Sequence, residues 1–260
     1  MSLAIEVDKL EVRYDDRVAL GDVTMSLDAG SSLAIIGPNG SGKSTLLAAI
    51  AGLAKPSRGA VSTFGVSPAF VLQSTEVDRS LPITVRDTVG LARYPSLGLL
   101  RRFGARDRQA VADALERLDI ADLADRQIHE LSGGQRQRVL VAQGLAQESP
   151  ILLLDEPITA LDIGSRAIIL DVMSEERAAG RTVLMTTHDL DDARRCQFVL
   201  LLRTTPVAYG TPAEVLTEAH LARAFGGHFV RVGDRLLLDD PHHHHHRTTE
   251  SPRRHGSGVG

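Results

Sequence analysis

Short apolar runs alternate with longer amphipathic stretches along most of the chain. Strand-length segments rich in apolar or β-branched residues predict strands over Ala4–Tyr14, Val18–Leu27, Ser32–Ile36, Ile151–Asp155 and Thr182–Thr187. Apolar residues at helical spacing predict helices over Lys43–Ala51, Arg106–Leu118 and Ser165–Ala179. Because strands and helices alternate and the later strands are almost entirely apolar, we expect an α/β fold whose parallel sheet is covered on both faces.

The remaining segments carry weaker patterns. Residues from about Glu76 to Gln147 are mostly helical in pattern. After His188 we expect a hairpin near Phe198–Tyr209, a helix that begins at Pro212 and an extended pair near Phe229–Leu238. The last segment, residues 239–260, is polar and has no periodicity, so we expect it to be disordered.

Composition narrows the class of protein. With 260 residues, of which 43% are hydrophobic, the chain can bury a sizeable core. The formal charge of -4 argues against a nucleic-acid partner. The single cysteine, Cys196, allows no internal disulfide, and we expect it to be buried. No signal peptide and no apolar run of membrane-spanning length is evident, so work at a membrane would need a partner that holds the chain there.

A glycine-rich segment between a predicted strand and a predicted helix carries the strongest chemical signal. The segment GPNGSGKST, Gly37–Thr45, fits G-x-x-x-x-G-K-[ST], which is a phosphate-binding pattern in this context. Backbone N–H groups of residues 40–44 can surround phosphate oxygens, aided by the helix dipole. Lys43 would bind the β- and γ-phosphates, and the Ser44 hydroxyl would bind Mg²⁺.

Two later strands end in polar residues that fit the same chemistry. The segment ILLLDE places Asp155 at the carboxyl end of a buried strand, where it would hold Mg²⁺ in the second shell of the ion, and Glu156 next to it, where it could polarise a water. A cap for the following segment is the structural alternative for this acidic pair. His188 ends the next strand, and a lone histidine is more often structural, but its place in the same sheet favours a catalytic role.

These motifs, in this order, resemble those of ABC-type ATPases over about residues 4–224. LSGGQ, residues 131–135, is identical to the signature sequence of that family. The resemblance implies that Gln73 senses the γ-phosphate and Mg²⁺, that His188 is the switch histidine, and that Tyr14 stacks on adenine. The implied contacts with ATP come from Tyr14, Gly37, Pro38, Asn39, Gly40, Ser41, Gly42, Lys43, Ser44, Thr45, Ser132, Gly133, Gly134, Gln135 and Asp162.

The resemblance also implies the architecture and a partner. The implied fold is a P-loop NTPase of ABC type, with a mostly parallel core sheet, an N-terminal antiparallel β subdomain and a helical insertion at about residues 76–148. Residues 1–225 would form this domain, and residues 226–260 a C-terminal extension. In this family the signature helix faces ATP held by a second subunit, so we expect a homodimer that ATP stabilises. Ile158 departs from the usual D-E-P-T, away from the catalytic positions.

The substrate is suggested by two segments. Residues 73–94 resemble the segment after the glutamine in ATPases of zinc and manganese importers, and iron-chelate and cobalamin importers share part of it. The tract His242, His243, His244, His245 and His246 suits Zn²⁺, although a purification tag or a silent tract remains an alternative. We therefore expect an importer of a divalent metal, with zinc as the favoured metal, at the cytoplasmic face of a bacterial membrane, with a separate permease and, indirectly, an extracytoplasmic metal-binding protein.

Other functions stay open at this point. An importer of iron chelates, or an exporter or regulatory ATPase with a separate permease, would carry the same nucleotide motifs. A soluble ABC ATPase of translation usually has two ATPase halves in one chain, and one of chromosome maintenance has a long coiled coil. Neither feature occurs here.

Overall fold

The computed structural model describes residues 2–72, 82–97, 102–226, 229–232 and 235–238. Its central sheet contains strands in the order β5-β6-β7-β3-β8-β9, and only β9 runs antiparallel to its neighbour. The strands are β3 (Ser32–Ile36), β5 (Ala69–Val71), β6 (Ile151–Leu154), β7 (Thr182–Thr187), β8 (Phe198–Arg203) and β9 (Thr205–Gly210). The expected α/β fold with a mostly parallel sheet is therefore confirmed.

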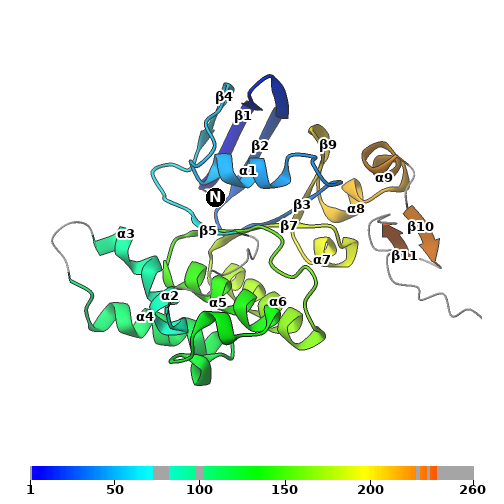
Figure 1. Cartoon of the computed structure of the whole chain (residues 1–260). Helices are drawn as coiled ribbons and strands as arrows, with labels where there is room; N and C mark the ends of the chain where they lie inside the picture. Colours follow the sequence, from blue (N-terminus) through cyan, green and yellow to red (C-terminus); the bar gives the residue numbers. More distant parts are fainter. Residues whose placement is uncertain (1, 73–81, 98–101, 227–228, 233–234, 239–260) are drawn as a thin grey trace, which may run out of the picture.

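A second sheet lies against one face of the central sheet, together with the first helix (Figure 1). It is antiparallel in the order β2-β1-β4, with β1 (Leu3–Tyr14), β2 (Arg17–Asp28) and β4 (Arg58–Ser62). Two later strands, β10 (Phe229–Val232) and β11 (Arg235–Leu238), form a separate antiparallel pair. The predicted N-terminal antiparallel sheet is present.

Helices cover the other face of the central sheet. The helices between β5 and β6 reach beyond the edge of the sheet on one side (Figure 1). The helices are α1 (Lys43–Ile50), α2 (Val85–Gly90), α3 (Tyr94–Leu97), α4 (Ala105–Arg117), α5 (Gly133–Ala146), α6 (Ile163–Ala178), α7 (Leu190–Arg194), α8 (Pro212–Val215) and α9 (Glu218–Phe225). Three 3-10 turns are η1 (Leu91–Arg93), η2 (Ala121–Leu123) and η3 (Ile128–Glu130). Among the described residues, no helix is both long enough and apolar enough to cross a bilayer.

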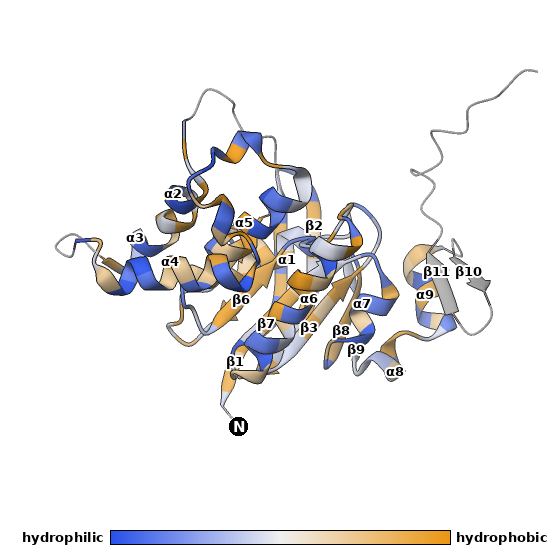
Figure 2. Cartoon of the chain, turned by 90° about the horizontal axis from the view of Figure 1, so that it is seen from below, coloured by the Kyte–Doolittle hydropathy of each residue, from blue (hydrophilic) through white to orange (hydrophobic). Residues whose placement is uncertain are grey.

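Alternate residues of the central strands enter two separate hydrophobic cores. In β3, Leu33 and Ile35 pack with α1 and the antiparallel sheet, whereas Ala34 and Ile36 pack with the helices of the other face. All four side chains are fully buried. This two-sided burial explains why the strand is a continuous apolar run, and in Figure 2 the strand β6 is likewise coloured mostly as hydrophobic.

The sequence patterns did not predict β4, β5, α7 or α9. β4 is an edge strand whose first three residues are exposed, so it lacks the alternation that marks a half-buried strand. β5 has only three residues. Its position depends on a tertiary contact, because a Cβ on Gly144 of α5 would lie 2.4 Å from Val71 Cγ2. Only glycine lets α5 approach the sheet this closely.

A network of charged side chains joins α4 to the core. The buried carboxylate of Glu176, in α6, accepts hydrogen bonds from Arg117 of α4 and from Arg181, which precedes β7. Burial lowers the pKa of the Arg181 guanidinium, and the charge of Glu176 opposes that shift. Glu175 accepts a second bond from Arg117, at 3.0 Å, and is exposed.

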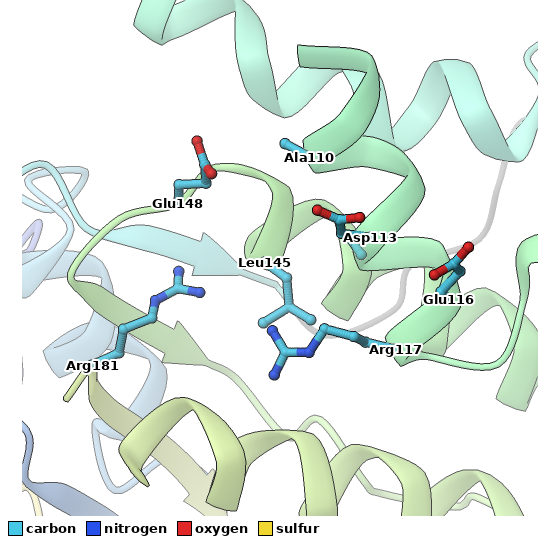
Figure 3. Close-up of a pocket in the computed structure, with 8 residues that line it drawn as sticks. Ala110, Asp113, Glu116, Arg117, Leu145, Glu148 and Arg181 are labelled. Atoms are coloured by element: carbon cyan, nitrogen blue, oxygen red, sulfur yellow. The ribbon is translucent and has the colours of Figure 1, made fainter. Parts of the chain in front are cut away.

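A cavity of about 530 Å³ lies beside this network and is open to solvent. Figure 3 shows Arg117 and Arg181 reaching toward the space beside Leu145 of α5 from opposite sides. The cavity has a mixed lining of guanidinium, carboxylate and aliphatic groups, so it presents no single charge to a ligand. The cavity lies where the helices that follow β5 meet the core.

We predict that Glu176→Ala lowers the free energy of unfolding by about 3 kcal/mol, because it leaves the mostly buried Arg181 without its carboxylate. Glu175→Ala is the matched control, since it removes an exposed carboxylate from the same Arg117 and should cost less than about 1 kcal/mol. Chemical denaturation of both variants measures the difference. An equal fall in the free energy of unfolding in both variants would show that the burial of Glu176 adds nothing to its contribution to stability.

Candidate active site

The loop of residues 37–42 is held between β3 and α1 by close backbone contacts. A Cβ on Gly37 would lie 2.1 Å from the carbonyl oxygen of Leu202. Gly42 caps α1 with a φ of 97°, and its Cβ would lie 2.6 Å from Ala19 O. The N–H of Thr204 donates to Ser41 O at 2.9 Å. Glycine is required at position 37 because a Cβ would collide with backbone. It is required at position 42 because of a similar collision and because of the positive φ.

Lys43 begins α1 and turns back over this loop. Its ammonium donates hydrogen bonds to Gly37 O at 2.8 Å and to Pro38 O at 3.2 Å. The residue is only 7% exposed, and burial lowers the pKa of its ammonium, although the charges of Glu156 and Asp155 act in the opposite direction. A buried cation beside a helix N-terminus can bind the anionic oxygens of a phosphate.

The outer part of the loop is accessible. Asn39, Gly40 and Ser44 are exposed, whereas Ser41 is 3% exposed. The Ser41 hydroxyl has no hydrogen-bond partner within the described part of the chain. The predicted phosphate loop therefore combines exposed residues with a buried cation and a buried polar group that is not yet satisfied.

Asp155 and Glu156 follow β6 and are joined by a threonine of the neighbouring strand. The Thr186 hydroxyl donates to Asp155 Oδ1 at 2.7 Å and accepts the N–H of Glu156 at 2.7 Å. The N–H of Asp155 donates to Val71 O at 2.9 Å, so β5 fixes the same residue from the other side. The structure therefore brings the two predicted carboxylates to the edge where β3, β6 and β7 end.

Glu156 has a left-handed backbone conformation, with a φ of 47°. Such a φ is uncommon for residues with a side chain, and Thr186 and Thr159 hold Glu156 there. Thr159 donates to Glu156 Oε2 at 3.2 Å. The sequence predicts both carboxylates but not their support by Thr186, because that support depends on the parallel register that pairs Leu154 with Met185.

His188 follows the last residue of β7 and is exposed. Thr187, before it, is 2% exposed. Asp189, after it, caps α7 by accepting the N–H groups of Asp191 and Asp192. The imidazole therefore lies at the same edge of the sheet as Asp155, on a short link between a buried strand and a capped helix.

The signature residues form the entrance of α5. Ser132 and Gln135 make a capping box, in which Ser132 Oγ accepts the N–H of Gln135 at 3.2 Å and Gln135 Oε1 accepts the N–H of Ser132 at 2.9 Å. Ser132 and Gly133 are exposed, and a Cβ on Gly133 would meet nothing within 4 Å. The entrance of α5 is therefore accessible at Ser132 and Gly133.

Gly134 is packed more closely than Gly133. A Cβ there would lie 2.7 Å from Ser165 Oγ and 2.8 Å from Asp162 Oδ2, so Gly134 lets α5 pack against the first turn of α6. Asp162 caps α6 by accepting the N–H of Ser165 at 2.9 Å. Backbone hydrogen bonds, first that from Ser165, lower the pKa of the Asp162 carboxyl. The entrances of two helices thus lie side by side.

The other predicted residues fall in different places. Tyr14 ends β1 with 54% of its surface exposed. Ile158 is 5% exposed and belongs to the core, which explains why an aliphatic residue is accepted there. Gln73 and the tract His242–His246 lie outside the described residues, as do the predicted disordered segment and the first residues of the expected helical insertion. Within the described ranges, no group of three or more His, Cys, Asp or Glu side chains could hold a metal ion.

Comparisons with known proteins agree with this geometry. A family model described as ABC transporter matches residues 20–159. The manganese transport system ATP-binding protein MntA of Synechocystis sp. is 41% identical over 236 residues, which cover 86% of this chain and 91% of MntA. The zinc transport system ATP-binding protein TroB of Treponema pallidum is 38% identical over 232 residues, which cover 86% of this chain and 87% of TroB.

Solved structures have the same fold. An ABC transporter in an inward-facing conformation matches with a TM-score of 0.79 and 28% identity, over 91% of this chain and 96% of that one. The dimeric structure of the bacterial ABC transporter cassette MJ0796 matches with a TM-score of 0.71 and 26% identity, over 80% of this chain and 98% of that one. On these matches and on its nucleotide motifs, the chain belongs to the ABC transporter family and is one of the ATP-hydrolysing cassettes of that family.

Proposed function

We propose that the chain hydrolyses ATP as one of two identical subunits that drive a metal importer. The observation that carries the ATPase part is the group of Lys43, Asp155, Glu156 and Thr186 at one edge of the sheet. The names of the relatives, which include manganese and zinc transport systems, support the metal part.

ATP would bind with its phosphates against the loop of residues 37–45. Lys43 exchanges its bonds to Gly37 O and Pro38 O for oxygens of the β- and γ-phosphates, which compensates the cost of its burial. The N–H groups of residues 40–44 and the Ser41 hydroxyl supply further donors, and Thr45 continues the helix that aims its dipole at the phosphates. Tyr14, exposed at the end of β1, stacks on the adenine.

Mg²⁺ would be held by the Ser44 hydroxyl, the Asp155 carboxylate and, beyond the described residues, the Gln73 amide. These are oxygen ligands, which suit a hard cation. When bound, Mg²⁺ neutralises part of the charge on the β- and γ-phosphates. Thr186 donates to Asp155 Oδ1 and thereby holds the carboxylate in one orientation.

Glu156 would orient and polarise the water that attacks the γ-phosphate, accepting its proton in part. Its backbone is fixed by the bond of its N–H to Thr186, so the carboxylate is presented from a rigid strand end. His188 donates a hydrogen bond to a γ-phosphate oxygen, from an exposed position at the same edge. In this proposal Gln73, which lies outside the described residues, contacts the same phosphate.

A second copy of the chain would complete the site. Ser132, Gly133 and Gln135 at the entrance of α5 bind the γ-phosphate held by the partner, and Asp162 contributes from the entrance of α6. The adjacent helix N-termini present partial positive charge to that phosphate. Ile163 next to Asp162 is 89% exposed, which suits a surface that a partner covers.

The dimer would act on a separate membrane permease from its cytoplasmic side, with an extracytoplasmic protein delivering the metal. In this proposal residues 1–225 are the ATPase domain, residues 76–148 its helical insertion and residues 226–260 an extension. Among metals we favour zinc, because imidazoles of His242–His246 suit Zn²⁺ and could buffer it on the inner side. Manganese and iron-chelate import, and export through a separate permease, are the alternatives.

We predict that Glu156→Gln lowers the rate of ATP hydrolysis at least about 100-fold, since it removes the base that polarises water. ATP still binds, so the variant should sediment as a dimer with Mg-ATP and as a monomer without it. Glu175→Gln, an exposed carboxylate of α6, is the control and should hydrolyse ATP normally. A monomer at every ATP concentration would contradict the dimer.

Thr186→Val tests the support of the two carboxylates. The substitution keeps the shape and removes the hydroxyl that bonds both Asp155 and Glu156, so we predict a fall of about tenfold in kcat. Thr182→Val is the control, because Thr182 lies in the same strand and is buried, and its hydroxyl accepts the N–H of Gly30 at 3.1 Å instead of a bond at the two carboxylates. Equal rates in the two variants would exclude a special role for Thr186.

The metal is tested in vesicles that contain the permease, its binding protein and this chain. We predict that zinc stimulates ATP hydrolysis more than manganese or an iron chelate does, because the binding protein delivers the preferred metal. Stimulation by manganese alone would show that manganese is the transported metal. ATP-driven export of the metal would show that the chain belongs to an exporter. A chain that ends at Asp240 should bind fewer zinc ions in titration; an unchanged stoichiometry would remove the role of the tail.

A further inference from the structure

Arg166 in the first turns of α6 joins this helix to α7. Its Nη2 donates to Asp189 Oδ2 at 2.8 Å and to Asp192 Oδ1 at 2.6 Å. The Asp192 side chain is 2% exposed, whereas Arg166 and Asp189 are each 35% exposed. One nitrogen atom therefore holds two carboxylates of the neighbouring helix, at the border between the core and solvent.

Asp189 is the residue that follows His188, and several bonds fix it. Its N–H donates to Thr187 Oγ1 at 3.0 Å, and its Oδ1 accepts the N–H groups of Asp191 and Asp192. Its other oxygen, Oδ2, is the one that Arg166 binds. The direction of the exposed His188 between Thr187 and Asp189 thus depends on whether the Asp189 carboxylate keeps its place.

The charges around Asp189 explain why Arg166 is needed to keep the Asp189 carboxylate in position. Burial raises the pKa of the Asp192 carboxyl and the charge of Asp189 raises it further, while Arg166 and Arg195 act in the opposite direction. Burial also opposes ionisation of Asp189, but the hydrogen bonds from Arg166 and from the α7 amides leave its pKa lowered. Without Arg166 the two carboxylates would repel each other, and the more exposed Asp189 would be the one to move.

The same turn of α6 also contacts the entrance of α5. The N–H of Arg166 donates to Asp162 O at 3.0 Å, and a Cβ on Gly134 would lie 2.7 Å from Ser165 Oγ and 2.8 Å from Asp162 Oδ2. Arg166 is thus attached at its backbone to the turn that the signature residues contact, and at its side chain to the residue after His188.

We propose that Arg166 is a positioning residue for ATP hydrolysis: acting through Asp189, it holds His188 in the direction that the reaction needs. The turn of α6 that contains Arg166 packs against Gly134 at the entrance of α5, which would bind the nucleotide of the partner subunit. A movement of this entrance would therefore also move His188 of the same chain. The proposal rests on the role proposed above for His188.

The first test compares Arg166→Gln with Arg194→Gln. Arg194 lies on α7 and pairs with the exposed Asp191 at 2.6 Å, so its loss removes an arginine from the same region without touching Asp189. Arg166→Gln should lower kcat by about 10- to 100-fold and leave the KM for ATP nearly unchanged, since misplacement of a catalytic group affects the reaction more than binding. Arg194→Gln should leave both constants unchanged.

Arg166→Lys is the rescue variant. A single nitrogen of Arg166 contacts both carboxylates, so an ammonium can replace it and should restore most of kcat. This variant also keeps the proposal testable if Arg166→Gln folds poorly. Loss of kcat in Arg166→Lys equal to that in Arg166→Gln, with both proteins folded, would overturn the proposal.

A readout that does not depend on activity is the side-chain ¹H–¹⁵N spectrum of the histidines. The His188 signal is assigned by its loss in His188→Ala. It should move in Arg166→Gln and stay in place in Arg194→Gln; an unmoved signal in Arg166→Gln would refute the proposal. If the signal moves but His188→Ala hydrolyses ATP at the normal rate, Arg166 does position His188 and the role proposed for His188 in hydrolysis is wrong.

The combination of the two substitutions separates positioning from a general structural effect. In the His188→Ala background, Arg166→Gln should cause no further loss of kcat, because the group that it positions is already absent. Losses that multiply would show that Arg166 acts on something other than His188, and would overturn the proposal.

Discussion

Burial of opposite charges at one edge of a parallel sheet is the constraint on which the rest of this structure depends. Lys43 and Asp155 are each less than a tenth exposed, and neither charge would be stable there without polar partners. Loop carbonyls satisfy the ammonium, and Thr186 satisfies the carboxylate. A phosphate can replace the loop carbonyls without new burial, so the fold prepares the site before a ligand arrives.

Thr186 and Arg166 show how the site is supported from neighbouring elements. Thr186 ties the end of β6 to the end of β7 through one hydroxyl. Arg166 ties α6 to α7 through one nitrogen. In both cases a single polar side chain binds two groups on another element, so small movements of a helix or strand reach the groups proposed for catalysis.

The helix entrances of α5 and α6 form the second surface that the fold prepares. Gly134 brings them together because a Cβ would collide with Asp162 and Ser165, whereas Gly133 stays open. One glycine therefore serves packing and its neighbour serves access. The proposed partner nucleotide would meet Gly133 and the capping serine, and Gly134 would transmit its position to α6.

The sequence by itself determined the alternation of strands and helices, the phosphate loop, the two carboxylates and the histidine, because each depends on local spacing or on residue type. It did not determine β4 or β5, whose short segments have no period of their own, nor the roles of Thr186, Gly134 and Arg166. Thr186 contacts Asp155, Gly134 approaches Ser165 and Arg166 binds Asp189, which lie 31, 31 and 23 positions away in the chain. Only the tertiary structure decides such contacts, because they depend on strand register and helix packing, which no local pattern specifies.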